Sequence, residues 1–350
     1  MTRHEKALEI LAKGTVIPAT TLALDENRQF DEKHQRLLTR YYLEAGSGGV
    51  ATAVHSTQFE IRKPEFNLFE RVISTVVDEI GRYEEETGKV IVKVCGVCGP
   101  VEQAVREAKI AKELGFDAVL LSPGGLNHLS EDEMIDRTKA VAAEMPVIGF
   151  YLQKAVGGRV FTYDYWARLA EIENVVAIKC ASFNRYTTQD VVRAVTFSSR
   201  ADKIALYTGN DDNIVIDLIT KYHYTKDGKT LENHFRGGLL GHWSIWTANV
   251  VKMFDMLKTA EVSPALLTLA AEVTDCNSAF FDTAHNFSGC IPGMHEVLRR
   301  QGLISAIHCL NPDEVLSPGQ MEEIDRVYAM YPHLNDDAFV KDFLARHKDD

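Results

Sequence analysis

The chain has 350 residues, of which 45% are hydrophobic and 25% charged, and its formal net charge is −12. These values are typical of a globular protein large enough for one α/β domain with appendages. The acidic balance contains no basic block, which argues against a nucleic-acid partner or an anionic membrane surface. The sequence has no run of roughly 18 apolar residues that would predict a membrane span, and MTRHEKALEI lacks the apolar segment of a signal peptide. We expect a cytoplasmic protein.

Six cysteines are scattered along the chain and do not form the spacing of a disulfide framework, which suits a reducing compartment. Cys95 and Cys98 form a C-x-x-C motif, but no second C-x-x-C or H-x-x-H completes a zinc set. The histidines show no ligand spacing such as H-E-x-x-H. We therefore expect neither a metal nor an organic cofactor.

Strand signals recur at regular intervals from residue 14 to residue 244. They are short apolar or β-branched runs bounded by glycine, proline or polar residues. The expected strands are 14–20, 48–57, 89–95, 116–122, 145–151, the apolar run within 173–184, 203–209 and 238–244.

Apolar residues at helical spacing fill most of the intervals between these strands. Gly88 and Gly115 supply helix stops, and the segment 130–143 opens with a serine cap followed by acidic residues. The expected helices are 31–46, 69–88, 101–115, 130–143, 163–172, 211–222 and the segment TANVVKMFDMLKTA.

Eight strand–helix units in about 250 residues predict a (β/α)8 TIM barrel, an α/β fold whose active site lies at the C-terminal ends of the strands. A doubly wound open sheet is the alternative, but no G-x-G-x-x-G turn follows the first strand. We expect the barrel with its catalytic site at 1–260 and a C-terminal helical extension packed on it at 261–350. The polar segment 221–235 is an insertion expected on the face opposite the active site.

Lys179 stands inside a run from Val175 to Ala181 that otherwise predicts a strand buried on both faces. A lysine is rarely buried without a partner, and desolvation favours the neutral amine, which attacks carbonyl groups. Lys179 is therefore a candidate Schiff-base residue. The alternative is a strand-end lysine that reaches solvent or pairs with a carboxylate.

Polar residues at other strand ends are candidates for the same site. The hydroxyl of Tyr151, at the end of the neighbouring strand, could relay a proton, although an ordinary strand-end tyrosine is the alternative. Ser56 and Thr57 offer hydroxyls and backbone N–H groups for a carboxylate, although such residues fill loops routinely. The segment TGNDD is typical of a strand exit with a helix cap, and it places Asp211 or Asp212 on the catalytic rim.

Together these motifs resemble the dihydrodipicolinate synthase and N-acetylneuraminate lyase family of Schiff-base aldolases over most of residues 14–260. The shared motifs are HST, FY, VVAIKCAS, TGND and SIWTAN. The resemblance implies that Lys179 forms an imine with pyruvate or a pyruvoyl substrate and that Tyr151 shuttles the proton. It also implies that Ser56 and Thr57 hold the carboxylate, with Thr57 part of the relay. Gly158 matches a glycine that the family carries after strand five.

Departures from the family pattern predict a divergent member rather than a true dihydrodipicolinate synthase. Gln58 follows HST where the family has glycine, and SPGGLNH replaces the Pro-Tyr-Tyr sequence of the synthases. The arginine that binds the semialdehyde in those synthases has no counterpart at the same place. We expect a different or larger second substrate, contacted by Gln153, Lys154 or Arg159.

The expected protein is thus an enzyme, a lyase or aldolase that acts on a 2-oxo acid and an aldehyde through a lysine Schiff base and cleaves or forms a carbon–carbon or carbon–oxygen bond. The resemblance also implies a homodimer or homotetramer. Within this class, the alternative is a 2-keto-3-deoxy sugar acid dehydratase. Outside it, the alternatives are a catalytically weak barrel that binds or senses a 2-oxo acid, and a metal-dependent lyase, for which the sequence offers no ligand set.

Overall fold

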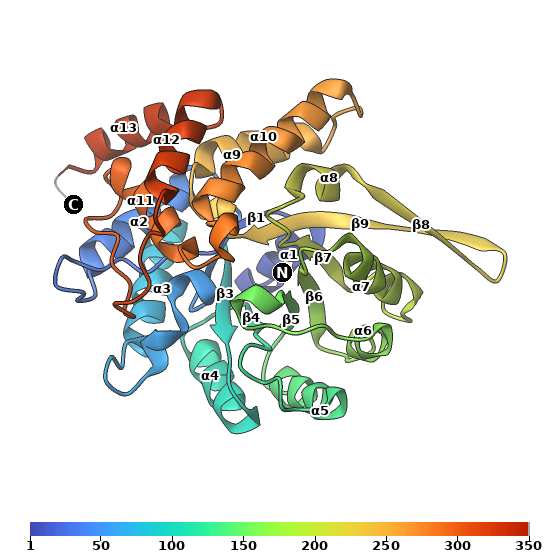
Figure 1. Ribbon diagram of the computed structural model, residues 1–350. Helices are drawn as coiled ribbons and strands as arrows, with labels where there is room; N and C mark the ends of the chain where they lie inside the picture. Colours follow the sequence, from blue (N-terminus) through green and yellow to red (C-terminus); the bar gives the residue numbers. More distant parts are fainter. Residues whose placement is uncertain (349–350) are drawn as a thin grey trace. The chain divides into compact units, whose positions relative to one another are not determined.

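A computed structural model describes residues 1–348 of the chain. These residues form two compact units, each built from two separate stretches of sequence. Unit 1 comprises Met1–Thr15 and Val92–Leu239, and unit 2 comprises Val16–Ile91 and the chain from Leu240 onward. Figure 1 labels the helices and strands of both units.

Unit 1 is built on a parallel sheet whose strands run in the order β3-β4-β5-β6-β7-β9. Residues of β3, β4 and β5 are buried throughout, as expected for strands covered on both faces. The strands are β3 (Val92–Val97), β4 (Ala118–Leu121), β5 (Val147–Leu152), β6 (Val175–Ala181), β7 (Ala205–Thr208) and β9 (Lys229–Leu240).

Helices alternate with these strands, as the sequence predicts, and two of them were not expected from the sequence. The segment before the first strand forms α1, capped by Thr2, and the segment after β6 forms α7, capped by Asn184. The helices of unit 1 are α1 (Arg3–Lys13), α4 (Val101–Glu113), α5 (Glu131–Ala142), α6 (Tyr163–Ala170), α7 (Arg185–Phe197) and α8 (Ile214–Ile219), with a 3₁₀ turn η3 (Lys154–Val156).

The polar insertion at 221–235 forms a β-hairpin. Strand β8 (Lys221–Lys226) pairs antiparallel with the first half of β9 through an Asp-Gly turn, in which Asp227 and Gly228 have φ of 51° and 73°. The hairpin reaches out from unit 1 in Figure 1, and Tyr224 anchors it on α7 by an edge contact with Phe197. The last barrel strand therefore begins well before residue 238, where the sequence placed it.

Unit 2 combines the two remaining parallel strands with helices from both ends of the chain. Ala19, directly after β1, forms a parallel bridge with Ala51 of β2. The elements are β1 (Val16–Pro18), α2 (Glu32–Glu44), β2 (Gly49–Thr52), η1 (His55–Thr57), η2 (Phe59–Arg62), α3 (Phe69–Thr87), η4 (His242–Ser244), α9 (Thr247–Leu257), α10 (Pro264–Phe280), η5 (Thr283–His285), α11 (Cys290–Arg300), α12 (Gln320–Met330) and α13 (Asp337–Arg346).

A buried carboxylate ties the last helix into the core of unit 2. Asp336 precedes α13 and is 3% exposed. Its Oδ2 accepts hydrogen bonds from the Tyr41 hydroxyl at 2.6 Å and the Ala248 backbone N–H at 2.9 Å. Its Oδ1 accepts one from Gln301 at 2.8 Å. The helices after residue 260 thus share a core with α2 and α9 of the same unit.

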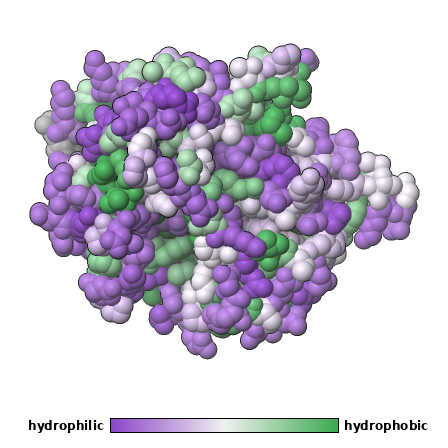
Figure 2. Space-filling view, in the orientation of Figure 1, coloured by the Kyte–Doolittle hydropathy of each residue, from purple (hydrophilic) through white to green (hydrophobic). Residues whose placement is uncertain are grey.

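The face shown in Figure 2 is mostly hydrophilic, with an apolar patch over α10. In this part of unit 2, Leu267 and Val262 are 54% and 70% exposed. Among the described residues, no helix combines the length and apolar character needed to cross a bilayer.

The packing of α13 gives a stability prediction. The Phe343 side chain is fully buried, and its ring lies edge-on to Tyr41 at 6.0 Å. We expect Phe343→Ala to lower the free energy of unfolding by about 3–5 kcal/mol, because the change removes apolar contacts and leaves a cavity. Urea unfolding followed by circular dichroism measures the loss. The exposed Lys341→Ala on the same helix is the control, and equal stability of the two variants would contradict this packing.

Candidate active site

Lys179 lies near the C-terminal end of β6 with its side chain on the same face of the sheet as Phe150. The two residues pair in register across β5 and β6, and the lysine Nζ lies 4.5 Å from the centre of the Phe150 ring. Lys179 is only 8% exposed. A cation over an aromatic face gains some electrostatic stabilisation, but a phenyl ring does not replace the water that a lysine ammonium loses on burial.

Burial lowers the pKa of Lys179 to about 8, although the nearby Asp211 carboxylate acts in the opposite direction. A lysine with a pKa of 8 is neutral in about one molecule in ten at pH 7, compared with about one in three thousand for an ordinary lysine. Lys179 therefore has the property that imine formation requires, a neutral amine near physiological pH.

Gly209, just after β7, provides space for the lysine side chain. A Cβ atom at this position would lie 2.6 Å from Lys179 Cε and 2.8 Å from Ala181 Cβ. Any larger residue at position 209 would therefore displace the Lys179 side chain. Gly209 belongs to the TGND segment, so the close approach explains why a glycine stands at that position.

Tyr151 occupies the opposite face of β5. It pairs with Cys180, and its ring stacks on Trp166 of α6 with the centroids 5.2 Å apart. Burial raises the pKa of Tyr151, while hydrogen bonding to Thr187 of α7 opposes the rise. Side chains alternate along a strand, so the residue that accompanies Lys179 is Phe150 rather than Tyr151. The relay role of Tyr151 stays a prediction.

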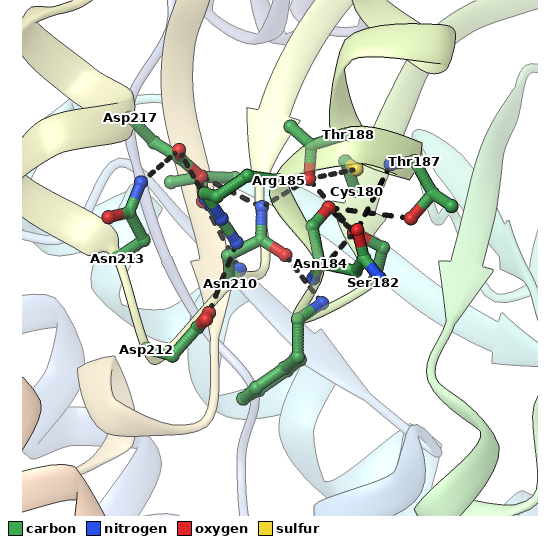
Figure 3. A network of polar contacts seen from close by, with 12 residues as sticks. Cys180, Ser182, Asn184, Arg185, Thr187, Thr188, Asn210, Asp212, Asn213 and Asp217 are labelled. Carbon is green, nitrogen blue, oxygen red and sulfur yellow. Dashed lines mark hydrogen bonds and ion pairs between the residues drawn. The ribbon is translucent and has the colours of Figure 1, made fainter.

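A polar network clamps the loop after β6 to the turn after β7 (Figure 3). Asp217 of α8 is fully buried, and its Oδ2 accepts hydrogen bonds from Thr208 at 2.7 Å and Asn210 at 2.8 Å. Its Oδ1 accepts from Arg185 at 2.9 Å and from Asn213 at 2.8 Å. Burial raises the pKa of Asp217, and Arg185 opposes the rise.

The same network reaches the backbone beside Lys179. The Asn210 Oδ1 accepts a hydrogen bond from the Phe183 N–H at 3.0 Å, and Phe183 adopts a left-handed φ of 52°. Arg185 also contacts Asp212 at 3.2 Å, so Figure 3 shows its guanidinium between two carboxylates. The network thus holds in place the loop after β6, which carries Phe183, and the turn after β7, which carries Asn210.

The loop after β5 contains the predicted contacts Gln153 and Gly158. The Gly158 N–H donates to the Gln153 carbonyl at 2.9 Å, and a Cβ at 158 would lie 1.8 Å from the Leu152 carbonyl oxygen. Gly158 is therefore required by a tight turn. Arg159 donates to the Leu129 carbonyl at 2.5 Å, which joins this loop to the one after β4. Gln153 is half-buried.

Ser56 and Thr57 lie in η1 of unit 2, and both are buried. The Ser56 hydroxyl donates to the Ala19 carbonyl at 2.7 Å, and the Thr57 hydroxyl donates to the Thr20 carbonyl at the same distance. Their hydroxyl protons are thus directed at the end of β1. Their role as carboxylate contacts stays a prediction that the resemblance implies.

Sequence reasoning did not identify Phe150, Gly209 or the Arg185–Asp217 pair. Phe150 follows from alternation only once the register of β5 and β6 is known. Asp217 lies in the expected helix 211–222, where a charged residue is ordinary, and Arg185 opens α7, which the sequence pattern did not predict. Within residues 1–348 there is no group of three or more His, Cys, Asp or Glu side chains arranged to hold a metal ion.

Comparison with known proteins identifies the family. The model of the dihydrodipicolinate synthetase family matches residues 12–222. The chain belongs to this family. The sequence resemblance is therefore confirmed for the family, and the low identities reported below fit a divergent member.

Curated relatives are similar over part of their length. A 4-hydroxy-tetrahydrodipicolinate synthase of Desulforudis audaxviator is 27% identical over 208 residues, which cover 59% of this chain and 66% of that protein. One from Syntrophus aciditrophicus is 27% identical over 210 residues, with the same coverage. The chain thus matches just under two thirds of the length of these family members.

Solved structures of the family share the fold over almost the whole chain. An N-acetylneuraminate lyase from Fusobacterium nucleatum has a TM-score of 0.71 at 16% identity and covers 91% of this chain and 99% of its own. A dihydrodipicolinate synthase from Oceanobacillus iheyensis has a TM-score of 0.73 at 15% identity and covers 95% of this chain and 100% of its own. The chain has the (β/α)8 barrel fold with a C-terminal helical extension, as the sequence predicts.

The clamp beside Lys179 gives the prediction for this site. We expect Asp217→Ala to lower the free energy of unfolding by about 3 kcal/mol, because it leaves the Arg185 charge and two amide groups without their acceptor. The surface change Asp202→Ala, which breaks an exposed ion pair with Lys203, should alter it by less than about 1 kcal/mol. Thermal or urea unfolding compares the two variants. Similar losses would contradict a central role for the clamp.

Proposed function

We propose that this protein is a lyase or aldolase that forms a Schiff base between Lys179 and a 2-oxo acid such as pyruvate. The observation that carries the proposal is a lysine near the end of β6 whose burial lowers its pKa to about 8. Membership of the dihydrodipicolinate synthetase family supports it, as do relatives named as synthases and a solved structure named as a lyase. The fold alone would not support this assignment, because the barrel hosts many chemistries.

The proposed reaction begins when the neutral amine of Lys179 attacks the keto carbon of the 2-oxo acid. Uptake of a proton by the hydroxyl group of the resulting carbinolamine, followed by loss of water, leaves a protonated imine, which draws electrons from the adjacent carbon. Loss of a proton from that carbon, or cleavage of the next carbon–carbon bond, gives a neutral enamine. The enamine then adds to an aldehyde, takes up a proton, or expels a hydroxyl group as water. This path uses no metal or organic cofactor.

The second substrate distinguishes this protein from the synthases. Gly124 and Gly125 follow β4, and the Gly125 N–H donates to the Gly157 carbonyl at 3.3 Å, so two glycine-containing loops meet there. Arg159 is engaged by the Leu129 carbonyl. These loops favour an aldehyde or deoxy sugar acid other than the semialdehyde that the synthases use. A homodimer or homotetramer remains a prediction.

A second candidate is a barrel that binds a 2-oxo acid with little turnover. The position of Tyr151 favours it, because the tyrosine stacks on Trp166 on the opposite face of β5 from Lys179. Such a protein would form the imine but exchange no proton and cleave no bond. The imine and the later steps must therefore be measured separately.

Borohydride trapping tests the imine. We expect incubation with pyruvate and borohydride to give a reduced adduct on Lys179, located by peptide mass spectrometry, because the neutral amine is available near pH 7. Lys179→Ala should give no adduct at any position, whereas the exposed control Lys203→Ala should label like the wild type. Absence of an adduct with pyruvate and with a panel of bulkier 2-oxo acids would contradict the proposed function.

A further inference from the structure

Residues 301–319 join α11 to α12 without forming a helix or strand. A connection of this length inside a compact unit is uncommon, and it is usually functional when it is ordered. The loop lies outside residues 12–222, which match the family model. Several of its apolar side chains are buried in unit 2, namely Leu303, Ile304, Cys309 and Leu310. The 301–319 loop is thus a packed element of the C-terminal extension.

Two residues on loops that follow barrel strands hold the same point of the 301–319 loop. Arg28, after β1, donates from Nη1 to the Cys309 carbonyl at 2.5 Å. Gln58, after β2, accepts a hydrogen bond from the Leu310 N–H on Oε1 at 2.6 Å. The two anchors therefore bind the carbonyl and the N–H of a single peptide unit. Loops that follow barrel strands lie on the catalytic face of this fold, so the 301–319 loop is fastened to two loops of that face.

Both anchoring residues have backbone conformations that disfavour a side chain. Arg28 and Gln58 have φ of 59° and 65°, values at which glycine is favoured. Gln58 stands where the family pattern has glycine, and it is only 1% exposed. Its Nε2 is buried and has no hydrogen-bond partner within residues 1–348, which adds a second cost. Such costs persist at functional sites where other contacts over-determine the conformation, and here that contact is the bond to the Leu310 N–H.

The turn that Gln58 closes carries the predicted carboxylate contacts. Ser56 and Thr57 directly precede Gln58 in the chain. Their hydroxyls donate to the two carbonyls that follow β1, those of Ala19 and Thr20, each at 2.7 Å. A tether on Gln58 therefore acts on the residue next to these hydroxyls. A carboxylate is bound by donors held at fixed positions, so its binding weakens when the turn that carries the donors can move.

We propose that Arg28 and Gln58 are positioning residues: by fastening the 301–319 loop, they hold the turn after β2 in the shape that binds the carboxylate of the 2-oxo acid. The inference rests on the proposed function, and on the family resemblance by which Ser56 and Thr57 hold that carboxylate. It adds a role for a part of the chain that the family model does not cover. A glycine at position 58 has no side chain with which to make this connection.

Reductive labelling of Lys179 with two ketones tests the inference. Pyruvate carries the carboxylate, whereas acetone has a methyl group in its place, so the ratio of the two labelling rates with borohydride measures the contribution of the carboxylate. Gln58→Met keeps the length of the side chain and removes the acceptor of the Leu310 N–H. We expect it to lower the ratio at least about tenfold, with acetone labelling within about twofold of wild type, because only carboxylate binding depends on the turn.

Two further variants complete this comparison. Gln58→Gly relieves the backbone as well as removing the acceptor, and it should lower the ratio in the same way. The exposed control Lys63→Ala, on the segment that follows the same turn, should keep the wild-type ratio. If only a bulkier 2-oxo acid labels the wild type, that acid and the methyl ketone matching it replace pyruvate and acetone.

A double variant tests whether the two anchors act through one loop. Arg28→Met should also lower the ratio, and Arg28→Met combined with Gln58→Met should lower it by no more than about threefold beyond the larger single effect, because independent effects would multiply. Hydrogen exchange followed by mass spectrometry reports on the loop itself. Peptides from 301–319 should exchange faster in both single variants, whereas peptides from α4 should exchange as in wild type, which shows that the variants are folded.

Different outcomes separate this inference from the proposed function. No adduct on Lys179 with any 2-oxo acid in the wild type would overturn both. An adduct in the wild type, with an unchanged ratio in both Gln58 variants, would overturn the inference alone. So would equal losses with pyruvate and acetone, or equal labelling of the wild type by the two, because the carboxylate would then not be the group affected. Unchanged exchange in 301–319, or multiplied losses in the double variant, would overturn the role of the loop.

Discussion

The proposed chemistry depends on the desolvation of one amine. A lysine ammonium is strongly hydrated, so a nearly buried position destabilises the charged form. Near the end of β6, the Phe150 ring lies beside the amine, and the absence of a side chain at Gly209 leaves room for the lysine methylenes. Asp211 limits the effect and keeps the pKa near 8 rather than lower. The balance gives an amine that is partly neutral at physiological pH and still able to carry charge as an imine.

A buried polar network lies in the chain segments that follow β6 and β7. In this network, Asp217 accepts hydrogen bonds from Arg185 and from side chains of the β7–α8 turn. A buried carboxylate is stabilising only when its acceptors are satisfied, and here they bind chain segments on both sides of Lys179. The polar groups of the clamp thus hold the loop after β6 and the turn after β7 in place.

Hydrophobic pattern predicted the barrel and the lysine strand because both depend on local periodicity. The continuous apolar run around Lys179 is unusual enough to mark a buried strand, and family membership confirms the resemblance built on it. The pattern did not reveal which neighbour faces the lysine. Phe150 and Tyr151 are adjacent aromatic residues, and the sequence does not show which of them lies beside the lysine. Only the register of β5 with β6 shows that Phe150 shares the face of Lys179.

Other differences also come from tertiary structure. The insertion at 221–235 is polar in composition, and its Asp-Gly turn makes it a hairpin that continues into the last barrel strand. A glycine is needed at position 209 because the side chain of Lys179, thirty residues earlier in the sequence, lies where a Cβ atom would be. Gly158 is required by a tight backbone turn, and its predicted contact with substrate stays a prediction. The Asp-Gly turn is a local hairpin signal that the sequence analysis missed, whereas the two glycines depend on close contacts that carry no periodic signal.

Direct titration of the Lys179 amine tests the central claim. NMR of protein labelled at the lysine ε-carbon, with the Lys179 signal assigned by its loss in Lys179→Ala, reports the protonation state of this group alone. The account predicts a midpoint near pH 8, well below the ordinary lysine value of about 10.4. A midpoint near the ordinary value would contradict it, because the amine would then be hydrated and cationic, and the imine would lack its physical basis.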